Sequence, residues 1–203
     1  MIMKYFIPFV FTALLIIGCS TPLTPPINEY TILPSEHLQK EKAPLSPHTL
    51  SIASSKTLPS LSSKSLYYLR EGGESGAYLY SRWSDTPAVL IQRSLTASLQ
   101  EKGVFTSLLP QTSAVHANWV LESELSAFYH RFPKNSKSEG VIDITYRLVD
   151  TSTKRSMGSK RFVITVAAPT DNATGGVNAL TLATEELCTQ VTTWITTLAQ
   201  EHP

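Results

Sequence analysis

Three consecutive segments in the C-terminal half of the chain alternate between apolar and polar residues, and this pattern constrains the fold more than any other feature. They cover residues 119–129, 141–150 and 160–166. Alternation with a period of two buries one face of a strand and leaves the other in water, as in an antiparallel sheet. We therefore expect a three-stranded meander. Its buried face is predicted to carry Trp119, Leu121, Leu125, Ala127, Tyr129, Ile142, Ile144, Tyr146, Leu148, Phe162, Ile164 and Val166.

Two other segments have helical periodicity. In residues 87–102 apolar residues recur every three or four positions, Pro87 suits a first turn and Gly103 suits the stop. A second helix is expected from Gly175 to about Ala199, and shorter strands at 29–33, 49–53, 65–70, 77–80 and 104–108. These elements predict an α+β fold: a mostly antiparallel sheet with a C-terminal three-stranded meander and two main helices packed on one face.

The start of the chain indicates export. Lys4 precedes an apolar run, residues 5–17, that ends at Gly18-Cys19. A basic start, a short apolar run and a small residue at the cut are typical of a secretory signal peptide. The run is shorter than the roughly 20 residues that a membrane-spanning helix needs. Residues 16–19 resemble the lipobox of bacterial lipoproteins, in which the cysteine is acylated; an ordinary signal peptide is the alternative.

This interpretation divides the chain into three parts. Residues 1–18 are the expected signal peptide, 19–28 the lipidated terminus with a Pro-rich tether, and 29–203 a single domain. The mature chain would carry 16 basic and 16 acidic residues, because Lys4 is the only charge removed. Nucleic-acid binding calls for a basic face, so no nucleic-acid partner is expected. With Cys19 acylated, Cys188 would have no disulfide partner, and its helical pattern favours a small core hydrophobe over a reactive thiol.

Two groups of residues are candidates for a partner-binding surface. Tyr80, Arg82 and Trp83 combine the residue types that dominate binding hot spots. Alternatively, Trp83 plugs the following helix against the sheet. The second group consists of Arg131, Phe132 and Lys134, in a loop predicted at residues 130–140. This loop would contact a partner or anionic headgroups; alternatively, it is simply solvated. No pattern of catalytic or metal-ligating residues occurs, so we expect neither an enzyme nor a cofactor beyond the covalent lipid on Cys19.

The block Tyr80-Ser81-Arg82-Trp83-Ser84-Asp85-Thr86-Pro87 resembles the signature of ABC-type transport auxiliary lipoproteins, the PqiC-like family. The strand at Glu29–Leu33 and the helix start at Gly176–Leu180 are also similar. The resemblance implies a fold similar to the N-terminal domain of TolB. It further implies a lipoprotein of the outer membrane that faces the periplasm and works with an inner-membrane system carrying MCE domains. Ser20 after the cysteine, where Asp would resemble an inner-membrane retention signal, agrees with this location.

The leading hypothesis is a non-catalytic docking or scaffold component of an intermembrane lipid transporter, anchored through acyl chains such as palmitate on Cys19. One alternative is a direct carrier that encloses a lipid or another apolar solute. Another is a lipoprotein that activates a cell-wall synthase. Self-assembly into a homo-oligomer is compatible with the resemblance.

Overall fold

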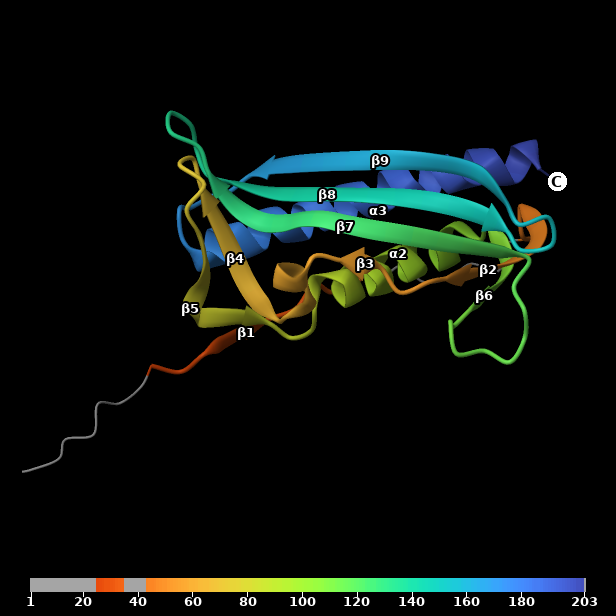
Figure 1. Cartoon of the computed structure of the whole chain (residues 1–203), viewed down its shortest axis with the longest axis horizontal. Coiled ribbons are helices and arrows are strands. Elements are labelled where there is room, and N and C mark those ends of the chain that lie inside the picture. The colour runs from red at the N-terminus through yellow and green to blue at the C-terminus, as the bar shows by residue number, and fades with distance from the viewer. Residues whose placement is uncertain (1–24, 35–42, 203) are drawn as a thin grey trace, which may run out of the picture.

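The structure, a computed structural model, describes residues 25–34 and 43–202. The predicted signal peptide and Cys19 lie outside these residues. The described elements, in chain order, are β1 (Asn28–Tyr30), β2 (Ser46–Ile52), β3 (Lys56–Thr57), the short 3-10 helix η2 (Pro59–Ser62), β4 (Ser65–Arg70), β5 (Ser75–Trp83), α2 (Pro87–Lys102), β6 (Phe105–Leu109), β7 (Trp119–Phe132), β8 (Glu139–Asp150), β9 (Arg155–Ala167) and α3 (Ala173–Glu201) (Figure 1).

All the described strands belong to one sheet, and β7 is its centre. Along the main path the strand order is β1-β5-β4-β7-β2-β6, while β8 pairs with β7 and β9. The long β7–β8 and β8–β9 pairings are antiparallel and contain most of the paired positions. The shorter β4–β5 hairpin is antiparallel as well. The predicted mostly antiparallel sheet with a C-terminal three-stranded meander is therefore confirmed. The remaining pairings, of β1 with β5, β2 with β6, and β2, β3 and β4 with β7, are parallel.

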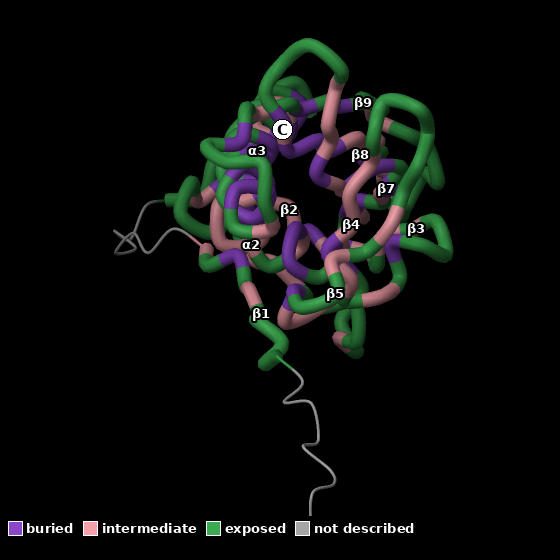
Figure 2. The backbone as a smooth tube through the Cα atoms, turned by 90° about the vertical axis from the view of Figure 1, so that its left-hand side faces the viewer, coloured by how far each residue is buried: buried purple, intermediate pink, exposed green. Residues whose placement is uncertain are grey.

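The two helices lie side by side on one face of the curled sheet, which confirms the predicted fold class (Figure 2). Helix α3 packs against β7, β8 and β9, and α2 packs beside it, with a hydrogen bond of 3.0 Å joining the hydroxyls of Ser98 and Thr192. The core between the layers includes Leu50, Leu90, Leu95, Leu121, Phe128, Ile144, Tyr146, Leu148, Leu180, Leu187, Val191 and Ile195. In the described part of the chain no helix is long and apolar enough to cross a bilayer.

Local sequence explains where the helices begin and end. Pro87 occupies the first turn of α2, and Gly103 ends it in the left-handed conformation at φ 64°, which glycine adopts without strain. The Asn172 side chain caps α3 by accepting a hydrogen bond of 2.9 Å from the Gly175 amide. Both helices extend close to their predicted bounds.

Two details of the predicted meander are wrong. Strand β7 continues to Phe132 and β8 starts at Glu139, so the predicted 130–140 loop shrinks to the segment between them. In addition, β7 has a bulge at Ser126, because Leu125 pairs with Ile144 while Ala127 pairs with Asp143. One extra residue reverses the faces of a strand. Beyond the bulge the buried side chains therefore include Phe128 and His130, and Tyr129 is only partly buried.

Candidate partner-binding surface

Trp83 belongs to the core and not to a surface. Its side chain is fully buried, and its ring meets that of Phe128 edge to face, with 5.5 Å between centroids. The prediction that Trp83 contributes to a partner-binding surface is corrected accordingly. The Arg-Trp block places Trp83 at the end of β5, three residues before the N-cap of α2, where it serves packing.

Arg82 ties the first strand to the sheet. Its guanidinium contacts the Glu29 carboxylate on β1, with Nε–Oε2 and Nη2–Oε2 distances of 2.9 and 2.8 Å. The two residues are direct neighbours in the parallel β1–β5 register. Because both side chains are about half exposed, the pair contributes little to stability, about 0–1 kcal/mol. The backbone pairing of β1 with β5 holds the strand in the sheet, and the ion pair adds a side-chain contact between them.

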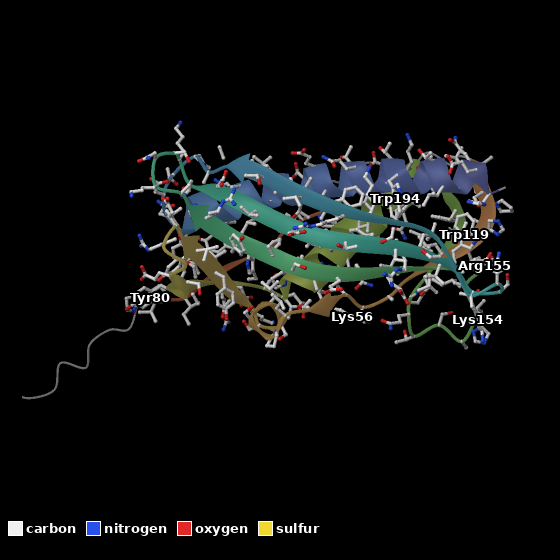
Figure 3. The ribbon with its side chains drawn as sticks, turned by 45° about the horizontal axis from the view of Figure 1, so that its top comes forward. Lys56, Tyr80, Trp119, Lys154, Arg155 and Trp194 are labelled. Atoms are coloured by element: carbon white, nitrogen blue, oxygen red, sulfur yellow. The ribbon has the colours of Figure 1, made fainter. Side chains whose placement is uncertain are left out.

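Tyr80 lies exposed at one end of the molecule, as the label in Figure 3 indicates. It sits in a bulged part of β5, since Ser65 pairs with Arg82 whereas Tyr67 already pairs with Ala77. Several β5 residues therefore face a single β4 residue. Such bulges bend a strand and redirect its side chains.

The second predicted group lies at the far end of β7. Arg131 forms an ion pair with Glu139, its cross-strand neighbour on β8. Phe132 is the last residue of β7 and is partly buried, and Lys134 is exposed in the β7–β8 connection. Strand β4 lies between β5 and β7. One strand therefore separates the two predicted groups in the sheet.

Sequence reasoning missed the residues that complete the second group. The Arg70 guanidinium lies over the rings of Tyr68 and Phe132, 5.5 and 5.4 Å from their centroids. The two rings meet edge to face at 6.4 Å. We call Tyr68, Arg70 and Phe132 the hairpin-tip cluster. The signal available in the sequence was the Tyr67–Arg70 run, but only the parallel β4–β7 pairing brings Arg70 next to Phe132.

A polar pair of one buried and one partly buried side chain packs against this cluster. His130 is fully buried, and its Nδ1 is 2.8 Å from the Tyr78 hydroxyl, while its Nε2 has no hydrogen-bond partner. Burial lowers the pKa of His130 and raises the pKa of Tyr78 to about 12. The imidazole is therefore neutral at pH 7, and its ring lies close to Gly176 in the first turn of α3.

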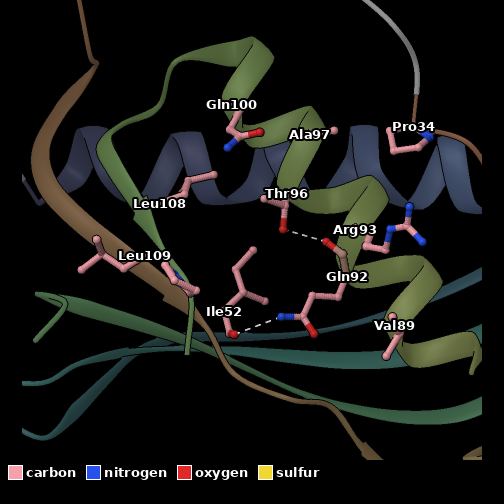
Figure 4. A pocket seen from close by; sticks show the side chains of 11 residues that line it. Pro34, Ile52, Val89, Gln92, Arg93, Thr96, Ala97, Gln100, Leu108 and Leu109 are labelled. Carbon is pink, nitrogen blue, oxygen red and sulfur yellow. Dashed lines mark hydrogen bonds between the residues drawn. The ribbon is translucent and has the colours of Figure 1, made fainter. Parts of the chain in front are cut away.

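A groove runs along α2 beside β2 and β6 (Figure 4). It has a volume of about 580 Å³. Two hydrogen bonds order its wall: Gln92 donates to the Ile52 carbonyl at 3.2 Å, and Thr96 donates to the Gln92 carbonyl at 2.8 Å. Its lining consists of Pro34, Ile52, Val89, Gln92, Arg93, Thr96, Ala97, Gln100, Leu108, Leu109 and Pro110.

Metal binding and thiol chemistry are the other candidate chemistries of the described residues. Among the described residues no group of three or more His, Cys, Asp or Glu side chains is arranged to hold a metal ion. Cys188 is buried in the core, as predicted, and burial raises the pKa of its thiol to about 12. A thiol with such a pKa is a poor nucleophile at neutral pH.

Residues 30–192 match the sequence model of a family described as the ABC-type transport auxiliary lipoprotein component. The chain belongs to this family. The match begins within β1 and ends in the second half of α3, so the ABC-type transport auxiliary lipoprotein family accounts for nearly the whole described fold. No curated protein is matched by the sequence.

Solved structures similar to this auxiliary lipoprotein agree on the fold. Protein XCC0632 from Xanthomonas campestris has a TM-score of 0.75 at 15% identity, over 87% of this chain and 98% of that one. The hypothetical protein CT253 from Chlamydia trachomatis has a TM-score of 0.56 at 7% identity, over 75% and 98% of the two chains. At such identities the likeness concerns the fold alone.

Proposed function

We propose that this auxiliary lipoprotein is a non-catalytic docking component of an intermembrane lipid transport system, held on the periplasmic side of the outer membrane by lipid on Cys19. The family membership supports the proposal, since it assigns the chain to ABC-type transport as an auxiliary component. The lipobox-like residues 16–19 and Ser20 supply the expected anchor and location. The partner is the MCE-domain protein of an inner-membrane system.

Anchoring is tested by Cys19→Ser. Several acyl chains hold a protein on a bilayer almost permanently, whereas a chain without them has no comparable attachment. We expect the wild type to sediment with outer-membrane vesicles in a density gradient, and the variant to leave that fraction. A variant that still sediments with the outer membrane and fully supports transport would contradict the proposed mechanism.

The docking surface that we propose is the hairpin-tip cluster. Aromatic and arginine side chains that are only partly buried are typical hot-spot residues, because a partner can complete their burial. The Arg70 side chain is about half exposed. Besides lying over the two rings, it forms a long ion pair of 3.8 Å with Glu74. Its charge is thus available to an acidic or aromatic group of the partner.

Co-purification with the MCE-domain protein from detergent tests this surface. Arg70→Glu reverses the charge between two rings and should reduce the retained partner at least about tenfold, the loss that 1.4 kcal/mol produces. The matched control is Arg155→Glu, which makes the same change at an exposed site at the opposite end of the molecule (Figure 3). Equal losses in both variants would place docking elsewhere, and a wild type that never retains the partner would contradict the function itself.

The α2 groove favours a second candidate function, that of a direct carrier. Its volume lies within the range of about 300–1,000 Å³ that is typical of small-molecule sites, and several of its lining residues are apolar. Native mass spectrometry of the protein without its anchor separates the two functions, because a carrier retains lipid stoichiometrically. Ala97→Trp would then fill the groove and release that lipid.

A further inference from the structure

Three exposed apolar residues occupy neighbouring positions in sequence and register near the first described strand. Leu79 and Tyr80 lie in the bulge of β5 and are 75% and 42% exposed. Asn28 pairs with Ser81 in the parallel β1–β5 register, so Ile27 lies beside Tyr80, with 54% of its surface exposed. We call Ile27, Leu79 and Tyr80 the tether corner.

The bulge of β5 leaves Leu79 and Tyr80 outside the core. Leu66 is the single β4 residue between the two registered pairs, and it is fully buried. Opposite it, residues 78–81 of β5 have no registered β4 partner, and Leu79 and Tyr80 among them are exposed. Other exposed apolar residues, such as Val115, Val163 and Leu182, come from separate elements. At the tether corner, by contrast, β5 and the residue that precedes β1 place such residues at neighbouring positions, and neighbouring exposed apolar residues indicate a contact surface.

The position of the corner selects a lipid surface as its occupant. Cys19 precedes Ile27 by eight residues, which span at most about 28 Å when fully extended. An anchored Cys19 therefore keeps the corner within that distance of the bilayer. Tyrosine is enriched at the headgroup level, where its ring is in an apolar layer and its hydroxyl in water. The neighbouring Arg82 is neutralised by Glu29, so no unpaired charge from this pair opposes the contact.

We propose that the tether corner inserts into the headgroup layer of the membrane that holds the Cys19 anchor. This inference rests on the proposed anchoring. It adds a non-covalent contact that orients the domain: the β1–β5 end faces the bilayer and the opposite end, with Arg155, points away (Figure 3).

The test uses the mature chain coupled through Cys19 to a maleimide lipid in vesicles of phosphatidylethanolamine and phosphatidylglycerol with brominated acyl chains. Chemical coupling makes the result independent of acylation in the cell, so failure of the anchoring hypothesis and failure of this one are distinguishable. Cys188 is buried and should remain unmodified. Bromine quenches nearby tryptophan. Of the native tryptophans, Trp83 and Trp119 are buried and Trp194 is partly buried on α3, so the emission of each variant is compared with that of the wild type.

We expect Tyr80→Trp to lose emission and shift to the blue relative to vesicles without bromine, whereas the control Arg155→Trp should not respond. Adding Ile27→Asp and Leu79→Asp to Tyr80→Trp should abolish the quenching. Absence of quenching at position 80, or equal quenching at position 155, would overturn the proposal. It would also be overturned if Leu79→Asp left lipid contact unchanged but reduced self-association or retention of the MCE-domain protein, because the corner would then bind protein.

Discussion

His130 combines complete burial with a ring nitrogen that has no hydrogen-bond partner. Adding a proton there places a charge in the protein interior, so burial lowers the pKa, and the nearby Asp171 opposes this only in part. In the unfolded chain the pKa is about 6.5. The unfolded state therefore binds a proton more readily than the folded state as the pH falls below that value. The stability that the neutral imidazole confers is therefore fully present above the pKa of the unfolded chain. It decreases as the pH falls below that value.

We expect the free energy of unfolding to fall between pH 7.5 and pH 5.5, with a contribution from His130 of up to about 1.4 kcal/mol per pH unit. His130→Gln retains a hydrogen-bonding group beside Tyr78 but cannot titrate. Urea unfolding at several pH values should give a flatter pH dependence for the variant, whatever its stability at pH 7.5. Parallel curves for the two proteins would exclude His130 as the titrating group.

At the scale of elements, the sheet and α3 are in unusually close contact at Gly140. A Cβ atom there would lie 2.8 Å from the Ala179 carbonyl carbon and the Leu180 nitrogen, both in the α3 backbone. Only glycine lets the start of β8 approach the helix so closely. Gly176 does the same from the helix side, where a Cβ would meet the His130 ring at 2.6 Å.

Gly140→Ala should therefore destabilise the protein by about 1–3 kcal/mol, the usual cost of overpacking. The matched control is Gly72→Ala in the β4–β5 turn, where nothing lies within 4 Å of the added methyl group. We expect the control to change stability by no more than about 0.5 kcal/mol. Urea denaturation measures both, and equal stabilities for the two variants would show that α3 shifts freely over β8.

The element scale also shows where sequence reasoning fails. Alternation in β8 predicted the buried Ile142, Ile144 and Tyr146, because that strand keeps its period throughout. In β7 the single extra residue at Ser126 transferred burial to Phe128 and His130, and nothing local marks a bulge. The same limit applies to Tyr80, whose exposure arises from the mismatch between β4 and β5 and not from its own neighbours.

At the scale of the whole molecule, β7 makes the fold a single cooperative unit. It pairs with β2, β3, β4 and β8, so the described N-terminal strands and the C-terminal meander share one strand. We expect a single unfolding transition. Far-ultraviolet circular dichroism and tryptophan fluorescence should give coincident midpoints, because Trp83, Trp119 and Trp194 pack on β7, β6 and β9 residues respectively. Separate midpoints would indicate that the meander unfolds independently.

The global arrangement explains which parts of the candidate site were predictable. The meander and helices follow from local periodicity, which the sequence displays directly. The hairpin-tip cluster does not, because Arg70 and Phe132 meet only through the parallel β4–β7 pairing. Trp83 illustrates the converse: its residue type suggests a binding hot spot, yet only burial distinguishes a surface tryptophan from one in the core.

The length of α3 has a mechanical consequence. Its 29 residues extend for about 44 Å at 1.5 Å per residue, and the helix runs along the long axis of the molecule (Figure 1). A domain standing on its β1–β5 end would rise at least about that far above the bilayer. The tip of the β4–β5 hairpin lies towards the same end of the long axis as β1 (Figure 1), so a partner that docks on the hairpin-tip cluster would have to extend past the length of the domain to reach it.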